Sequence, residues 1–179
     1  MVISGFSVLV YAALWVVQAM ATLGRRARAV ELLEKLTPVW HARDAAAVAT
    51  YQVEPYVVAA DIYGVAPHLG RGGWTWYTGS AGWMYRVAVE SILGLRLEDG
   101  ATLLVRPCVP DAWPRFSAEL ALDGGRARYA IEVVNERGDA SRVVRAMVDG
   151  APVDVPDGIA RIPLARDGAL HRVRVELGG

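Results

Sequence analysis

The spacing of apolar residues changes near Gly94 and divides the chain into two parts. Before that point the spacing has a helical period. The apolar run at residues 8–23 and the amphipathic segment at residues 26–36 each predict a helix. A third helix is expected over residues 78–93, because Thr78 suits an N-cap and Gly94 suits the position just after a helix.

After Gly94 apolar and polar residues alternate with a period of two, which is typical of half-buried strands. Asp-Gly dipeptides, which favour tight hairpin turns, separate the alternating segments. Short strands at this close spacing predict an antiparallel β-sandwich. The expected strands cover residues 101–106, 116–122, 127–134, 142–148, 160–164 and 171–177, and the dipeptides are Asp123-Gly124, Asp149-Gly150, Asp157-Gly158 and Asp167-Gly168.

Helices and strands therefore occupy consecutive parts of the chain, which predicts the α+β class with two segregated units. We expect a helical segment at residues 1–97 and a β domain at residues 98–179. With 179 residues and 54% hydrophobic content, the chain can bury a sizeable core.

The apolar run at residues 8–23 has two interpretations. It is shorter than the about 20 residues of a membrane-spanning helix, and Gln18 and Thr22 interrupt it. No Lys or Arg precedes it, as the start of a signal peptide would require. We favour a buried core helix, and a membrane anchor for the β domain is the alternative.

Charge and cysteine content exclude several classes of function. The 19 basic and 19 acidic residues balance, so no net field attracts polyanions and nucleic acid is not an expected partner. Cys108 is the single cysteine, which excludes an intrachain disulfide and fits a reducing, cytoplasmic location. The three histidines, at positions 41, 68 and 171, lack the spacing of metal ligands, so no metal site is expected.

A glycine- and aromatic-rich stretch, RGGWTWYTGSAGWMYR, lies at residues 71–86 and delivers the chain to the expected helix at Thr78. The N–H groups and the dipole at a helix N-terminus attract anions, and Gly79 would let a phosphate approach the backbone. The alternative is that Thr78 only caps the helix and Gly79 only packs.

Neighbouring polar and aromatic side chains have similar paired interpretations. Trp74 and Trp76 can stack on the apolar face of a sugar or fill the core, and alternation places them on one side of an extended segment. Glu54 can bind sugar hydroxyls or belong to a turn fixed by the proline beside it. Arg71 can pair with phosphate or with a carboxylate. His68, in a loop, is expected to pack or face solvent.

Two segments in consecutive order carry a family resemblance. YQVEPYVVAADIYGVAPHLGRGGWTWYTGSAGWMYRVAVESILGL at residues 51–95 and RPCVPDAWPRF at residues 106–116 resemble glycoside hydrolase family 94. The members of this family are inverting glycoside phosphorylases, and the motif sequences are most similar to those of its cyclic glucan synthase branch. The resemblance covers the chain from about Tyr11 onward, which makes it more specific than any single motif.

The resemblance implies the last helices of an (α/α)6 barrel followed by a C-terminal β-sandwich. It implies phosphorolysis of β-glucosides, in which phosphate attacks C1 while an aspartic acid protonates the glycosidic oxygen. Inorganic phosphate is then a co-substrate and no other cofactor is expected. In the family, the Thr-Gly pair that corresponds to Thr78 and Gly79 binds the phosphate.

Two departures from the family pattern qualify that expectation. The family's catalytic aspartic acid lies upstream of the stretch represented here, so no catalytic residue is assigned in this chain. A histidine that binds phosphate in the family corresponds to Tyr11, which can donate a hydrogen bond but has no positive charge near neutral pH. Residues 1–10 resemble a disrupted start, such as that of a truncated gene product.

We therefore expect a fragment of a glycoside phosphorylase that is inactive alone. A non-catalytic carbohydrate-binding or interaction remnant and a membrane-anchored β-domain are the competing hypotheses. Residues 71–77 are called the aromatic loop below. Asp61 is the one carboxylate near this loop besides Glu54, and the resemblance places it away from the family's acid. Helices that lack barrel neighbours would partly expose Tyr11, Trp15, Val16 and Met20, which predicts self-association or poor solubility.

Overall fold

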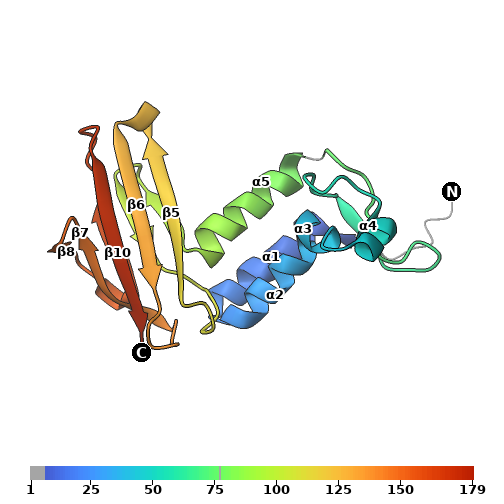
Figure 1. Ribbon diagram of the computed structural model, residues 1–179, viewed down its shortest axis with the longest axis horizontal. Helices are drawn as coiled ribbons and strands as arrows, with labels where there is room; N and C mark the ends of the chain where they lie inside the picture. The colour runs from blue at the N-terminus through green and yellow to red at the C-terminus, as the bar shows by residue number, and fades with distance from the viewer. Residues whose placement is uncertain (1–6, 77) are drawn as a thin grey trace. The chain divides into compact units, whose positions relative to one another are not determined.

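The computed structural model describes residues 7–76 and 78–179, and the fold is α+β, as the sequence predicts. The chain forms two compact units, one up to Ala88 and the other from Val89 onward. Most helices belong to the first unit and most strands to the second (Figure 1). The assignment of residues 1–97 to a barrel and of residues 98–179 to a sandwich stays a prediction.

Three longer helices organise the first unit. Helix α1 (Val10–Thr22) packs against α2 (Arg26–Leu36) and against α5 (Thr78–Arg86), and Figure 1 shows α1 and α2 side by side. The buried residues of α1 are Val10, Leu14 and Val17, which lie on one stripe of the helix.

The opposite face of α1 is apolar and exposed. Tyr11, Trp15 and Val16 keep 42%, 55% and 48% of their surface accessible. The sequence expectation for these side chains is confirmed, since α1 is apolar on more sides than its neighbours in this unit cover. Self-association through this face stays a prediction.

The stretch between α2 and the aromatic loop holds short elements that sequence periodicity does not reveal. Helices α3 (Pro38–His41) and α4 (Ala45–Tyr51) are capped by Thr37 and Asp44, whose side-chain oxygens accept from backbone N–H groups at 3.3 and 2.8 Å. Strand β1 (Ser7–Leu9) pairs antiparallel with β2 (Asp61–Tyr63). Elements this short contain too few residues to show a period.

Helix α5 begins at Thr78, as predicted, and continues into a π-helical segment, η1 (Val87–Ile92). Gly94 follows with a φ of 69°, the left-handed backbone typical of the position after a helix. The predicted end of this helix is therefore confirmed. The wider π-helical turn is not encoded in any simple sequence pattern.

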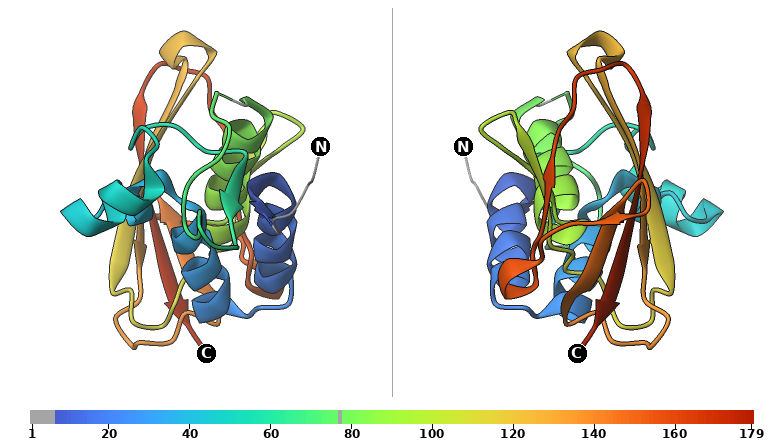
Figure 2. Two further views of the ribbon diagram at one scale, coloured as in Figure 1. Left: turned by 90° about the vertical axis from the view of Figure 1, so that its right-hand side faces the viewer. Right: turned by 90° about the vertical axis from the view of Figure 1, so that its left-hand side faces the viewer.

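The second unit contains two sheets. One has the order β3 (Leu95–Glu98), β4 (Thr102–Val105), β9 (Ala160–Pro163). The other has the order β5 (Arg115–Leu122), β6 (Ala127–Val134), β10 (Leu170–Gly178), β7 (Arg142–Val148), β8 (Ala151–Pro152), and Figure 2 shows β5, β6 and β10 from two further sides. Short 3₁₀ turns lie at η2 (Asp123–Gly125) and η3 (Pro156–Gly158).

Every strand predicted after residue 100 is present, and both sheets bury their apolar rows. The buried side chains of the smaller sheet include Leu103, Val105 and Ile162. Those of the larger sheet include Tyr129, Ile131, Val133, Val173 and Val175. The alternating burial along β6 and β10 agrees with the period-two pattern from which these strands were predicted.

The expectation of an entirely antiparallel sheet is wrong at one strand pair. Strand β10 runs parallel to β6, with Val173 opposite Ile131, and antiparallel to β7. Parallel neighbours need a long connection, which the chain provides because β7, β8 and β9 intervene between β6 and β10. Hairpin signals describe only neighbours in sequence, so they could not show this pairing.

The Asp-Gly dipeptides form tight turns where the sequence predicted them. At Asp123-Gly124, Asp149-Gly150 and Asp157-Gly158 both residues have positive φ, as two-residue hairpin turns require. At Asp167-Gly168 the glycine alone has positive φ. Asp99-Gly100, which joins β3 to β4, has the same positive-φ geometry and was not predicted as a turn.

Within residues 7–76 and 78–179, none of the helices combines the length and the apolar character that crossing a membrane would require.

We predict that Gly94→Ala destabilises the protein markedly. A Cβ atom at this position would clash with the backbone carbonyl of Arg106, and because the obstacle is backbone, no side-chain movement can remove the clash. The positive φ adds strain for any residue with a Cβ. The matched control is Gly138→Ala, where φ is 66° and no heavy atom lies within 4 Å of the added Cβ. Chemical denaturation should show Gly94→Ala to be about 1–3 kcal/mol less stable than the control. Equal stabilities would contradict the close packing.

Candidate functional site

The first turn of α5 exposes Gly79 and Ala81, whereas Ser80 is buried. It reads Thr-Gly-Ser-Ala and carries no acidic residue. Gly79 is exposed, and a Cβ atom built there would meet no heavy atom within 4 Å. The first N–H groups of an α-helix have no intrahelical partner and so remain available to an anion. The side chain of Thr78 lies outside the described part of the structure, so a role for its hydroxyl stays a prediction.

The aromatic loop before α5 is held against strand β2 by backbone hydrogen bonds. The amide of Gly73 donates to the carbonyl of Asp61 at 2.8 Å, and the amide of Ala60 donates to the carbonyl of Trp74 at 2.7 Å. The amide of Tyr63 donates to the carbonyl of Arg71 at 2.9 Å. Residues 71–74 thus lie beside β2 almost as a further strand, which fixes the positions of their side chains.

The glycine doublet allows this close approach. A Cβ atom at Gly72 would meet the side chains of Tyr51 and Val53, and one at Gly73 would meet the carboxylate of Asp61. Tyr51 is buried behind the loop, and this burial raises the pKa of its phenol, which therefore stays neutral at physiological pH. The adjacent glycines before Trp74 are the sequence signal that could have indicated this packing.

The tryptophans of the glycine- and aromatic-rich stretch divide into open and packed ones. Trp74 and Trp76 have 72% and 69% of their surface exposed, and Trp76 has a positive φ of 65°. Trp83 is half-buried within α5, with its ring 6.0 Å from that of Tyr11 and the guanidinium of Arg86 5.5 Å above it. Two of the indoles are therefore exposed to solvent, whereas the third belongs to helix packing.

The contacts of Tyr11 are those of a packing residue and do not by themselves indicate phosphate binding. Its ring makes an edge contact with Trp15 at 5.4 Å between centroids and lies near Trp83. The structure does place it beside α5, the helix whose N-terminus is the candidate anion site.

A hollow of about 270 Å³ brings several of the candidate residues together. Arg71 and Trp74 line it with His68, and the ring of His68 lies 5.8 Å from that of Tyr63. Neither Glu54 nor Trp76 lines this hollow. The backbone carbonyl of Glu54 accepts from the amide of Val57 at 3.2 Å, which agrees with the turn interpretation of that segment without testing its side chain.

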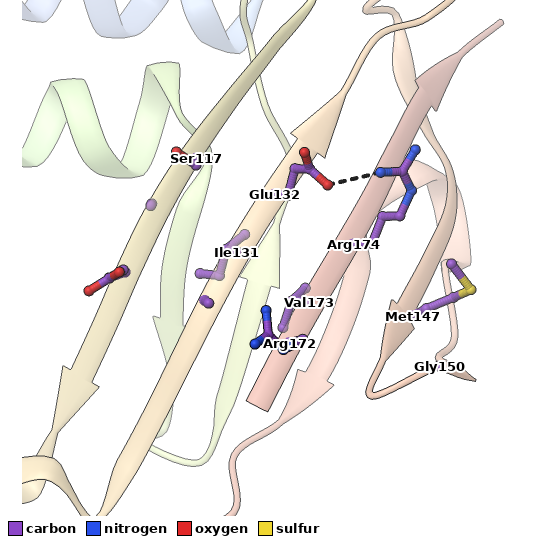
Figure 3. A pocket seen from close by; sticks show the side chains of 11 residues that line it. Ser117, Ile131, Glu132, Met147, Gly150, Arg172, Val173 and Arg174 are labelled. Atoms are coloured by element: carbon purple, nitrogen blue, oxygen red, sulfur yellow. Dashed lines mark hydrogen bonds and ion pairs between the residues drawn. The ribbon is translucent and has the colours of Figure 1, made fainter. Parts of the chain in front are cut away.

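A second, larger hollow lies on the outward face of the five-stranded sheet and was not predicted (Figure 3). Its volume is about 550 Å³. One cross-strand row of its lining consists of Ser117, Glu132, Arg174 and Met147. The small side chain of Ala130 lines its base. Any half-buried strand has polar residues on its solvent-facing side, so no sequence signal distinguished this surface from other sheet surfaces.

Arg174 is fixed in that hollow by surrounding carboxylates. Its guanidinium lies 2.8 Å from Glu132, 3.0 Å from Glu136 and 3.6 Å from Glu176, and Figure 3 marks the contact with Glu132. Arg172 lies on the same face and is exposed. Among the described residues, no group of His, Cys, Asp and Glu is arranged to hold a metal ion.

Comparison with known proteins identifies the family. Residues 6–94 match the model of the glycosyl hydrolase 94 superfamily, catalytic domain. This region of the chain belongs to glycoside hydrolase family 94, and the resemblance found in its sequence is confirmed. The chain is also 49% identical over 129 residues to the cyclic beta-(1,2)-glucan synthase NdvB of Rhizobium meliloti, covering 72% of this chain and 4% of that protein.

Two phosphorylases are similar as well. The N,N'-diacetylchitobiose phosphorylase of Vibrio furnissii is 37% identical over 166 residues, covering 92% of this chain and 19% of that enzyme. The solabiose phosphorylase of Paenibacillus borealis is 29% identical over 127 residues, covering 69% of this chain and 15% of that enzyme. The chain thus spans about a fifth or less of the length of these relatives.

Proposed function

We propose that this chain contributes part of the phosphate and sugar site of an inverting glycoside phosphorylase that acts on β-glucosides. The observation that carries the proposal is the open N-terminus of α5 directly after a loop with two exposed indoles. Membership of a family whose relatives here include phosphorylases supports it. We further propose that residues 1–97 form part of an (α/α)6 barrel and residues 98–179 a β-sandwich.

The nucleophile in this reaction is inorganic phosphate. The amides of the first turn of α5, at Gly79 and the residue after it, would donate to phosphate oxygens, and the Thr78 hydroxyl would add one hydrogen bond. Arg71 would supply positive charge from the loop, and Tyr11 a neutral hydrogen-bond donor. The proposal invokes no cofactor besides phosphate.

The sugar would lie against the aromatic loop. Trp74 and Trp76 present flat apolar surfaces of the kind that stack on the C–H face of a pyranose ring. Glu54 would accept hydrogen bonds from sugar hydroxyls. The general acid that protonates the glycosidic oxygen is assigned to no residue of this chain, so complete catalysis requires a carboxylic acid from elsewhere.

Phosphate should bind at the start of α5 and depend on the Thr78 hydroxyl. Backbone amide resonances of Gly79 and Ser80 should shift on titration with millimolar phosphate, relative to sodium chloride at the same ionic strength. Thr78→Ala should weaken binding about tenfold, since one hydrogen bond to a charged group is lost. Thr78→Ser keeps the hydroxyl and should bind nearly as the native chain does. If the resonances of these amides do not move when phosphate is added, the proposal of phosphate binding is wrong.

The purified chain alone should not phosphorolyse β-linked glucobioses at a useful rate. Loss of a general acid typically lowers rates about 10²–10⁴-fold, and misplacing the sugar lowers them further. The assay supplies glucobiose and phosphate and measures glucose 1-phosphate. Turnover that disappears in Asp61→Asn would identify Asp61 as the acid and overturn this assignment.

The hollow on the five-stranded sheet favours a second candidate function, binding of a glucan chain by the β unit. Fixed carboxylates and guanidinium groups match the donors and acceptors of sugar hydroxyls. Arg172→Ala should reduce retardation of the chain in gels that contain soluble β-glucan. Arg145→Ala removes an arginine of the same sheet that does not line the hollow, so it is the matched control. Equal retardation of both variants would argue against this site.

A further inference from the structure

His171, at the start of β10, lies between two carboxylates. Its Nδ1 atom is 2.7 Å from Oδ2 of Asp149, and its Nε2 atom is 3.2 Å from Oδ1 of Asp167. The imidazole is largely covered, with 16% of the side chain exposed, whereas both aspartates are about half exposed. Each ring nitrogen therefore has one acidic partner.

The three side chains join separate segments of the second unit. Asp149 belongs to the turn between β7 and β8, and its Oδ1 accepts from the amide of Arg172 at 2.8 Å. Asp167 belongs to the turn that precedes β10, and its Oδ1 accepts from the amide of Ala169 at 2.9 Å. The contacts of His171 thus tie two turns to one strand.

The neighbouring tyrosine completes this connection. The ring of His171 stacks on that of Tyr129, with centroids 5.0 Å apart and planes at 27°. The hydroxyl of Tyr129 accepts from the amide of Ala165 at 2.6 Å, so the chain leading into the Asp167 turn is held from β6 as well. The histidine is therefore positioned by packing independently of its charge.

A neutral imidazole has one N–H group and cannot donate to both carboxylates. With the proton on Nδ1, the lone pair of Nε2 would face the oxygen of Asp167, which is repulsive. The double contact therefore requires the imidazolium form. In agreement, hydrogen bonding to Asp149 raises the pKa of His171 above its ordinary 6.5.

The other charged groups around the histidine do not titrate in the same range. Backbone N–H groups, from Arg172 to Asp149 and from Ala169 to Asp167, hold the pKa of each carboxyl below its ordinary 3.8. The guanidinium groups on the adjoining segments stay charged in proteins. These belong to Arg126, Arg128, Arg166 and Arg172, of which Arg166 pairs with Asp123 at 2.9 Å.

We propose that Asp149, His171 and Asp167 form a pH-dependent latch whose Asp167 side opens when the imidazolium loses its proton. The Asp149 side keeps its shorter hydrogen bond, while the Asp167 turn loses its contact with the histidine. A raised histidine pKa adds stability that is fully present below about 6.5 and is lost as pH rises through the folded value. Lowered aspartate pKa values add stability above about 3.8 that is lost as pH falls through their folded values.

The latch can be tested by NMR on the full chain between pH 5 and 9. The ring resonances of His171 should titrate with a midpoint above 6.5. Amide protection factors at Gly168 and Ala169, referred to unfolded rates at the same pH, should fall about tenfold through that midpoint, since a hydrogen bond to a charged group is lost. Protection in the turn at Gly158 should not change. Flat protection at Gly168 and Ala169 while His171 titrates would overturn the proposal, as would a midpoint at or below 6.5.

Two variants separate the latch from a general pH effect. Asp167→Asn should lower the His171 midpoint and abolish the pH dependence of protection at Ala169. Asp157→Asn alters another Asp-Gly turn of the same unit and should leave both unchanged. A His171 midpoint that is the same in the two variants would contradict the latch. The native titration remains decisive if the Asp167 variant does not fold.

Discussion

The close approach of the Gly72 and Gly73 backbone to the elements behind it determines where the candidate site lies. Tyr51 and Asp61 occupy the space that side chains at these two positions would need. Because the chain can lie flat there, its amides and carbonyls pair with β2, and the loop gains a fixed path. The exposed indole of Trp74 is thus presented by a backbone that is already ordered, so a ligand would not bear the cost of ordering it.

The second unit depends on a different constraint, the agreement between strand alternation and turn chemistry. Aspartate and glycine adopt the positive φ values that tight hairpins require at Asp123-Gly124 and Asp149-Gly150, so the consecutive strands β5 and β6, and β7 and β8, pair in a fixed register. Asp149, which has positive φ, and Asp167, which precedes a glycine of positive φ, also provide carboxylates beside His171. At Asp149, a residue type that suits the turn backbone thus also supplies one of the charges of the proposed latch.

Local patterns in the sequence predicted the elements better than their arrangement. The strands after residue 100 and the helix stop at Gly94 follow from periods and turn residues, which act over a few positions. The parallel pairing of β10 with β6 joins residues 42 positions apart, such as Val173 and Ile131, and no local signal encodes it. For the site, Trp74 and Arg71 were predicted and do line one hollow, whereas Glu54 and Trp76 do not join them there.

The charges in the first unit agree with a reaction in which one group of residues binds the phosphate and another provides the proton. An attacking phosphate needs hydrogen-bond donors and positive potential, and a helix N-terminus without acidic residues provides both from the backbone. The departing sugar needs a proton from an acid held on the opposite side of the reacting carbon. Asp61, the carboxylate beside the loop, lies behind Gly73 and is fixed in the packing of the loop. The first unit thus offers features suited to the nucleophile of the proposed reaction, and under that proposal the proton comes from a group outside these residues.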